Sequence, residues 1–597
     1  MQTPTPAKFT LALDNTTDAP QTLNSGVNLS LVAYGGVERL IELNTNGSLF
    51  TIEEGAVLNM GNNIRLQGRN GNTAALVQIN TDGTFNMNGG AIAGNHRIGG
   101  GGAGVFNSGT FNMEGGEIHE NTSSVAGGGV FLGSDTIFTM NGGRIHTNTS
   151  QSVAGGGIAG NPRARFYMND GEISNNISLS TTHGGGGIFL SNDAIFTMRN
   201  GIISGNETNR RGGAVFIAPR GSFFMYNGKI TSNIASQHAG GVYGVDASFF
   251  MYNGKITGNT ASQHAGGVYM DNFANFTMEG GEISDNTAGN DGGGVFVRRR
   301  VTFTMNGGLI SGNEANQGGG GVFVGTGYGV NATFNMNGGV ISHNEASQGG
   351  GVFITNTGTF TMEGGEISGN TSTSSGAGVR VAGGTFIMDN GVISGNVTNA
   401  DGGGVLVELG GIFTMNDGEI ADNTAVNVGG GVVVRANSAF NMNNGRIIGN
   451  KANSTGNPHG GGGVHVIGIF TMTNGEISGN TASRDGGGVM VWVNGTFTMV
   501  DGLIIGNTAL LSGGGVFLAV NGNFTMNNGE ISGNTAMDRG GGVCIGASGI
   551  FTMNNGVITG NTAHTNGGGG IWRHSSGTFN FTIHATVINN TPNNVYP

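Results

Sequence analysis

The 597-residue chain contains one cysteine, eight prolines and two tryptophans, and only 10% of its residues are charged. With Cys544 as its single cysteine the chain forms no intrachain disulfide, so packing and hydrogen bonds must hold the fold. No apolar run approaches the ~18 residues of a membrane-spanning helix. The net charge of −12 is unsuited to neutralising nucleic-acid phosphates. These shortages exclude a disulfide scaffold and argue against a membrane-spanning or nucleic-acid-binding protein.

Glycine, in contrast, is abundant, with 122 of the 597 residues. Such a content alone is typical of collagen or of disordered chains. Collagen does not fit, because glycine does not recur at every third position, and proline is too rare for either class. The glycines instead stand at fixed positions of a longer repeat, where they indicate backbone turns.

That repeat reads Phe-x-Met-x-x-Gly-x-Ile-x-x-Asn, followed by a Gly-Gly-Val signal, and it occurs eighteen times in steps of 26 to 31 residues, mostly 27. A fixed period of this size predicts a solenoid, in which each repeat buries its apolar face against its neighbours. The first-position phenylalanines are Phe85, Phe111, Phe138, Phe166, Phe196, Phe223, Phe249, Phe276, Phe303, Phe334, Phe360, Phe386, Phe413, Phe440, Phe470, Phe497, Phe524 and Phe551.

Residues 302–324 show how one repeat is expected to fold. Alternation predicts a strand over 302–305 with Phe303 and Met305 on one side, a turn at the glycines, a short strand around Ile310, and a third strand over 320–324. Three strands per ~27 residues predict an all-β, right-handed, three-sided parallel β-helix of about 20 coils. Asn313 and its equivalents are expected to form a ladder of hydrogen bonds along one corner.

The repeat also divides the chain. Residues 1–40 do not fit it and are interpreted as an irregular N-terminal lead-in or cap, and 41–84 as degenerate first coils. Residues 85–577 hold the regular β-helix repeats, and 578–597 a degenerate last coil and C-terminal tail. No second domain is expected.

Two segments, Ile477 to Val489 and Ile531 to Val543, join Ile-Ser-Gly-Asn-Thr-Ala to Gly-Gly-Gly-Val. This pattern resembles the repeats of bacterial polymorphic outer-membrane proteins and related autotransporter-adhesin passengers, which pair Phe-x-x-Asn with Gly-Gly-Ala-Ile elements. The resemblance covers roughly residues 85 to 575, with isoleucine in place of the family's phenylalanine before the asparagine. It implies a surface-exposed β-helix and leaves the activity open, because related helices serve as adhesins, tailspikes and polysaccharide enzymes.

Residues able to support catalysis are scattered. An enzyme on this scaffold would gather carboxylates on one face over two or three adjacent coils. Asp291, Asp401 and Asp485 share one repeat position but lie three or more coils apart. The histidine pairs His119 with His146 and His238 with His264 match a repeat duplication, and we assign them no metal. We therefore expect no enzyme activity, cofactor or metal; a polysaccharide-acting enzyme and an ice-binding surface on the Thr-x-Thr rows are less favoured alternatives.

A more informative row lies between the two valines of the third strand. If the valines face inward, this row is a solvent-facing aromatic stripe, which would mark a contact surface. The alternative is that aromatic residues occur there only for their β-propensity and ladder stacking. The row begins Phe106, Phe131, Ala159, Phe189, Phe216, Tyr243, Tyr269, Phe296, Phe323 and Phe353.

Two nearly identical coils, reading Phe-Phe-Met-Tyr-Asn-Gly-Lys-Ile-Thr, cross this row and give the candidate binding residues. A recent duplication of one coil would produce the same pattern without any ligand. The candidate partner-binding residues are Phe224, Tyr226, Lys229, Tyr243, Phe250, Tyr252, Lys255 and Tyr269.

Together these features predict a non-enzymatic extracellular or cell-surface protein, an adhesin or stalk that presents a binding surface to a glycan or protein partner. The alternative is a structural protein that assembles with copies of itself into filaments or arrays, because an open β-helix end is a free sheet edge. No apolar stretch follows Met1, so we expect the export signal to have been removed or to belong to a larger chain.

Overall fold

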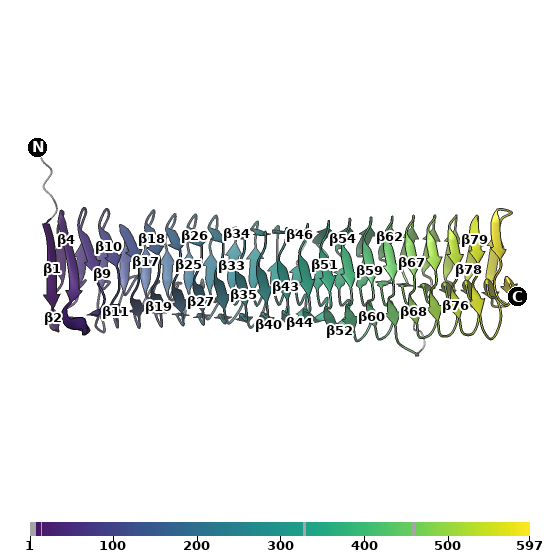
Figure 1. Ribbon diagram of the computed structural model, residues 1–597, viewed down its shortest axis with the longest axis horizontal. Coiled ribbons are helices and arrows are strands. Elements are labelled where there is room, and N and C mark those ends of the chain that lie inside the picture. Colours follow the sequence, from purple (N-terminus) through teal and green to yellow (C-terminus); the bar gives the residue numbers. More distant parts are fainter. Residues whose placement is uncertain (1–6, 14, 326–329, 457–459, 597) are drawn as a thin grey trace, which may run out of the picture. The chain divides into compact units, whose positions relative to one another are not determined.

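Figure 1 shows the fold in a computed structural model, which describes residues 7–13, 15–325, 330–456 and 460–596. The chain forms two compact units, one of Met1–Asn290 with Gly294–Phe296, and one of Asp291–Gly293 with Val297–Pro597. Apart from a single 3-10 turn, η1 (Tyr34–Gly36), the regular structure of the described residues consists of short β-strands. Within each unit these strands pair in parallel, coil upon coil, which confirms the predicted all-β parallel solenoid.

One coil of the second unit illustrates how the chain winds. β58 (Ile412–Met415), β59 (Glu419–Ala421), β60 (Thr424–Ala425) and β61 (Val432–Val434) follow one another, and each pairs with its equivalent in the next coil. We name the resulting sheets the Phe sheet, the Ile sheet, the short sheet and the Val sheet, in that order. The same four strand types build the coils of the first unit, for example β30 (Ser222–Met225), β31 (Lys229–Thr231), β32 (Ile234–Ala235) and β33 (Val242–Val245).

The Phe sheet follows the repeat directly, because every strand with the Phe-x-Met motif lies in it. In the first unit its strands are β1 (Ala7–Leu13), β4 (Val27–Ala33), β7 (Val57–Met60), β10 (Thr84–Met87), β14 (Thr110–Met113), β18 (Ile137–Met140), β22 (Arg165–Met168), β26 (Ile195–Met198), β30, β34 (Ser248–Met251) and β38 (Asn275–Met278). In the second unit they are β42 (Thr302–Met305), β46 (Ala332–Met336), β50 (Gly358–Met362), β54 (Thr385–Met388), β58, β62 (Ala439–Met442), β66 (Ile469–Met472), β70 (Thr496–Met499), β74 (Asn523–Met526), β78 (Ile550–Met553) and β82 (Thr578–Phe581).

Pairing in register stacks like side chains into columns inside each unit. Phe413 pairs with Phe440 and Met415 with Met442, and all four side chains are fully buried. From Phe303 to Phe551 the stacked rings have centroids 4.6–4.8 Å apart and planes 4–6° apart. Offset stacks of this kind add to the stabilisation from burial. The apolar core is therefore a set of parallel columns along each coil stack.

The predicted asparagine ladder is present at the corner after the Ile sheet. The side-chain Nδ2 of Asn423 donates to the carbonyl of Ile393 at 2.9 Å and to the Oδ1 of Asn450 at 3.0 Å. Its own Oδ1 accepts the backbone N–H of Asn396 at 3.0 Å. These asparagines are fully buried, and the ladder satisfies corner backbone groups that water cannot reach.

Each regular coil has one strand more than the sequence predicts. The residues directly after the ladder asparagine form the two-residue strands of the short sheet, such as β60, which pairs with β64 (Lys451–Ala452). Their second residue points inward, so Ala425 and Ala452 are buried in a column of their own. A two-residue strand shows no alternation, which is why sequence periodicity indicates three sides only.

The described part of residues 1–40 is not an irregular lead-in. β1 pairs in parallel with β4 over seven residues, and β4 pairs with β7, so Leu29 and Leu31 occupy the Phe and Met columns. β2 (Thr16–Asp18) and β3 (Gln21–Leu23) likewise join β5 (Arg39–Leu43) and β6 (Phe50–Ile52). The motif is missing here, but leucines with the same alternation replace Phe and Met. At the C-terminal end β82, β83 (Ala585–Ile588) and β84 (Val595–Tyr596) pair with the preceding coil.

Candidate partner-binding surface

The structure separates the eight candidate residues into two groups. Phe224, Tyr226, Lys229, Phe250, Tyr252 and Lys255 lie on the outer side of the Phe and Ile sheets or at the corner between them. We call these six residues the tyrosine–lysine face. Tyr243 and Tyr269 belong to the Val sheet and are only 2% and 1% exposed, so they are not part of an accessible surface.

The burial of Tyr243 and Tyr269 corrects the predicted solvent-facing stripe. Arg211 lies over the Tyr243 ring at 5.3 Å and donates to its hydroxyl at 3.2 Å, and the ring of His238 stacks on Tyr269 at 4.9 Å. These covering side chains come from the connection between the short sheet and the Val sheet. Because that connection lies over the outer side of the Val strands, Phe216, Phe296 and Phe323 are buried as well.

The aromatic part of the tyrosine–lysine face is a pair of short ladders. β30 and β34 pair in register, so Phe224 stacks on Phe250 at 5.1 Å and Tyr226 on Tyr252 at 4.7 Å between ring centroids. Tyr226 and Tyr252 follow their strands at the corner and are 46% and 41% exposed. The outward neighbours of Phe224 and Phe250 in the adjoining coils are Thr197 and Thr277. The aromatic group is therefore confined to two coils.

Two lysines continue the face onto the Ile sheet. Lys229 in β31 and Lys255 in β35 (Lys255–Thr257) are register partners on adjacent coils. The Nζ of Lys255 lies 2.7 Å from the Oε2 of Glu282, and this hydrogen bond raises the pKa of Lys255 and lowers the pKa of Glu282. On its other side Lys229 has Ile202 as register partner. Among the described residues no carboxylate forms an ion pair with Lys229.

Two arginines in the same outward row of the Ile sheet each lie between two acids. Arg144 lies between Glu117 and Glu172, with nitrogen–oxygen distances of 3.3 Å to both. In the second unit Arg446 lies between Glu419 and Glu476, at 3.2 and 3.8 Å. Each of these cations thus alternates with two acids. The two adjacent lysines of the tyrosine–lysine face break this alternation.

In the part of the chain that the structure describes, no three or more His, Cys, Asp or Glu side chains form a group that could hold a metal ion. Asp401 pairs with Arg435, and Asp485 is held by Arg484. His119 and His146 stack with ring centroids 5.1 Å apart. Burial, with a contribution from His146, lowers the pKa of His119. The two histidines are register partners on adjacent coils, which explains why their rings stack.

A small cavity in the second unit surrounds Asp485. It has a volume of about 230 Å³ and is lined in part by Arg484, Arg539 and Trp572. The Oδ2 of Asp485 accepts from the Nε of Arg484 at 2.9 Å, and its Oδ1 accepts the backbone N–H of Ser512 at 3.1 Å. Burial nevertheless raises the pKa of Asp485, because desolvation outweighs these partners. The sequence analysis did not identify this cavity.

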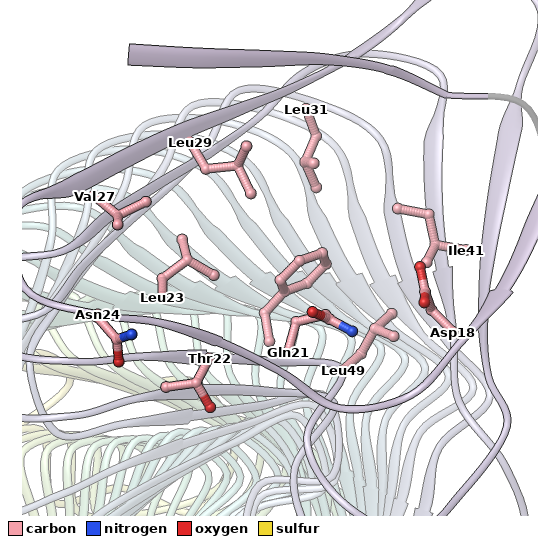
Figure 2. A pocket seen from close by; sticks show the side chains of 11 residues that line it. Asp18, Gln21, Thr22, Leu23, Asn24, Val27, Leu29, Leu31, Ile41 and Leu49 are labelled. Atoms are coloured by element: carbon pink, nitrogen blue, oxygen red, sulfur yellow. The ribbon is translucent and has the colours of Figure 1, made fainter. Parts of the chain in front are cut away.

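A second cavity lies at the beginning of the first unit. Figure 2 shows Leu23, Leu29 and Leu31 around its opening, in front of the coils that follow. It has a volume of about 310 Å³ and its lining is mainly apolar, with Asp18 as its one titratable side chain. Leu23, Leu31 and Ile41 in its lining are buried, so the cavity lies against the apolar core of the first coils.

Sequence reasoning also overlooked Arg199. It follows β26 as Tyr226 follows β30, so it is the equivalent residue one coil earlier, and its Nη1 donates to the Oδ1 of Asn169 at 2.8 Å. A comparison of the residues that follow each Phe-x-Met motif would have found it, because this row otherwise contains mostly asparagine and acids.

The fold and this surface place the chain among parallel β-solenoids. No family model, no curated protein and no solved structure matches the chain. In the described residues no helix is long and apolar enough to cross a membrane.

Proposed function

We propose that this chain is a non-enzymatic extracellular or cell-surface protein, an adhesin or stalk that presents the tyrosine–lysine face to a glycan or protein partner. The observation that supports the proposal most is local: on an otherwise regular scaffold, two adjacent coils replace Thr, Asn and acidic residues with exposed aromatic and cationic side chains. Tyrosine is enriched at the energetic centres of interfaces because it offers a large rigid ring with a hydroxyl. The resemblance to polymorphic outer-membrane protein repeats supports a surface location.

The scaffold suits such a role physically. Coil-on-coil pairing stacks the four rings in a fixed arrangement, so little conformational entropy of the rings is lost when a partner binds. Thr197 and Thr277 adjoin the two phenylalanines in the neighbouring coils, and Ile202, which is 43% exposed, adjoins Lys229.

The test is a binding screen of the whole chain on glycan arrays and extracellular-matrix protein arrays. We expect the double variant Tyr226→Ser/Tyr252→Ser to lose the signals that the native chain gives. The matched control is Asn416→Ser/Asn443→Ser, which changes two adjacent exposed residues of the same row in the second unit and should leave binding intact. Unchanged binding by the tyrosine variant would refute the proposed surface.

A second candidate function is self-assembly, favoured by the apolar residues near the C-terminal end. Phe581 is 69% exposed and Ile583 is 94% exposed. These residues lie in and just after β82, which pairs with β78. Exposed edges with apolar neighbours favour pairing with another chain.

Sedimentation velocity over a range of concentrations, with negative-stain microscopy, distinguishes the two candidates. Self-assembly predicts filaments or a concentration-dependent shift that Ile583→Asp removes. If the chain is monomeric at all concentrations, self-assembly is excluded and partner binding remains as the proposed function.

A further inference from the structure

We propose that the tyrosine–lysine face binds an acidic polysaccharide, through its carboxylate or sulfate groups. This inference rests on the proposed function, and it names the chemistry of the ligand. Four observations lead to it: the unbalanced charge, the orientation of the rings, the spacing of the donors and the boundaries of the face.

The charge is the first observation. Like charges on neighbouring strands destabilise a sheet, and Arg144 and Arg446 in the equivalent row each lie between two acids. Lys229 and Lys255 are register partners, but among the described residues only Lys255 forms an ion pair with a carboxylate, that of Glu282 at 2.7 Å. Both lysines are exposed, and their two like charges lie on register partners in adjacent coils. A bound anion would restore the missing balance.

The orientation of the rings is the second observation. Tyr226 and Tyr252 stack with planes only 6° apart, so each ring covers one face of the other. The two side chains are 46% and 41% exposed, so the stacked pair and its hydroxyl groups are accessible to a ligand. A phenolic hydroxyl donates and accepts hydrogen bonds, which suits the hydroxyl groups of sugars better than a flat apolar ligand.

The spacing of these donors is the third observation. One hydroxyl and one ammonium group recur in each of the two coils, at the spacing of adjacent parallel strands, about 4.8 Å. A pyranose unit of an extended polysaccharide spans a similar length, so a chain along the coil stack would place one sugar on each coil. An extended peptide repeats its same-face side chains only every ~6.6 Å and would fall out of step. The spacing favours an acidic glycan over an acidic peptide.

The boundaries of the face are the fourth observation. Arg199 occupies the tyrosine row one coil before Tyr226, and its guanidinium extends the donor surface on that side. On the other side Glu282 follows Lys255 and would repel an anionic chain. The face is thus limited to two or three coils, which sets the length of ligand that it can recognise.

The experiment is calorimetric titration of the whole chain with hexagalacturonate and with its methyl ester. We expect hexagalacturonate to bind, the uncharged ester to bind at least tenfold more weakly, and binding to weaken as salt is added, since these charges are exposed. A sulfated heparin hexasaccharide, titrated in parallel, shows whether carboxylate or sulfate is preferred.

The decisive variant is Lys229→Glu. It places a carboxylate beside Lys255 and recreates the alternation seen around Arg144, so we expect native stability and at least a tenfold loss of binding. Arg446→Ala, which removes a balanced cation from the same row, is the control and should bind normally.

Equal binding of hexagalacturonate and its ester, or unchanged binding by Lys229→Glu, would overturn the inference. So would tighter binding of a poly-glutamate peptide. If neutral glycans bind and only Tyr226→Ser/Tyr252→Ser abolishes binding, the proposed function stands and the acidic ligand is wrong. If neither Lys229→Glu nor Tyr226→Ser/Tyr252→Ser changes binding, both the acidic ligand and the proposed binding surface are wrong.

Discussion

Asn423 and Asn450 occupy the same corner of adjacent coils, and the side chain of the first donates to the Oδ1 of the second at 3.0 Å. Asn423 also donates to Ile393 and accepts from Asn396, so one fully buried amide joins three coils. This relationship is repeated along the ladder. It explains why asparagine recurs at this position, since alanine or leucine could satisfy none of these groups.

We therefore predict that Asn423→Ala destabilises its neighbourhood by at least about 2 kcal/mol, because buried polar groups lose their partners. Hydrogen exchange should show faster local opening of β58 and β62, since the stability of a solenoid is a sum of local terms. Asn443→Ala removes an exposed ladder bond of 2.8 Å to Asn416 and serves as control, with an expected change within about 0.5 kcal/mol. Equal effects of the two substitutions would contradict the role of the buried ladder.

The phenylalanine column gives a second prediction. Phe413 is fully buried between Phe386 and Phe440, each with a ring centroid 4.7 Å away. Phe413→Ala should cost about 3–5 kcal/mol, through lost burial and an unfilled cavity. Thr414→Ala, on the outer side of the same strand, should stay within about 0.5 kcal/mol. Urea unfolding of both variants measures the difference; a mild effect of Phe413→Ala would mean that the column repacks.

Gly418 tests the turn between β58 and β59, and Gly410, which precedes β58, is its control. Gly418 has φ of +99°, and a Cβ there would lie 2.6 Å from the Cε of Met388 and 2.7 Å from the carbonyl oxygen of Gly391. Gly410 has φ of +83° but open space around the Cβ position. Gly410→Ala should cost about 1–2 kcal/mol for its backbone alone, and Gly418→Ala clearly more. Similar thermal unfolding of the two variants would show that the steric contact is unimportant.

Because Asp485 is buried, we predict that it gives the stability of the folded chain an unusual dependence on pH. Burial raises its pKa in the folded chain, so the folded state binds the proton more tightly than the unfolded state. Its contribution to stability is therefore present below the ordinary carboxyl pKa and is lost as the pH rises through the raised value. Relative to native protein, Asp485→Asn should gain stability over that range. Urea unfolding of the native chain and of Asp485→Asn at pH 3 to 8 measures the difference in their free energies of unfolding. A difference that stays constant with pH would contradict the raised pKa of Asp485.

The regular part of this fold can be predicted from sequence because each coil repeats its side-chain chemistry. The ten-residue spacing from Phe303 to Asn313 places the column and the ladder correctly. The two-residue strand at Thr424 could not be found, because it is too short for a period to appear. Leu29 and Leu31 were missed for another reason: they occupy the Phe and Met columns without the motif.

The candidate surface was predicted less completely. Exposure of Tyr226 and Tyr252 follows from their place outside the alternating strand, and the structure agrees. Tyr243 and Tyr269 look outward by the same alternation, but the path of the connection that covers them leaves no periodic signal. The unbalanced position of Lys229 could have been found by alignment of the coils, which places Ile202 and Lys255 on its two sides.

The most direct test of the account is hydroxyl-radical footprinting of the whole chain with and without hexagalacturonate. We predict that Tyr226 and Tyr252 become protected when the glycan is added, while Tyr34, which is 79% exposed and lies far from the face in sequence, stays reactive. Binding without protection of the two tyrosines, or protection spread over other coils, would contradict the claim that the tyrosine–lysine face is the binding surface of this solenoid.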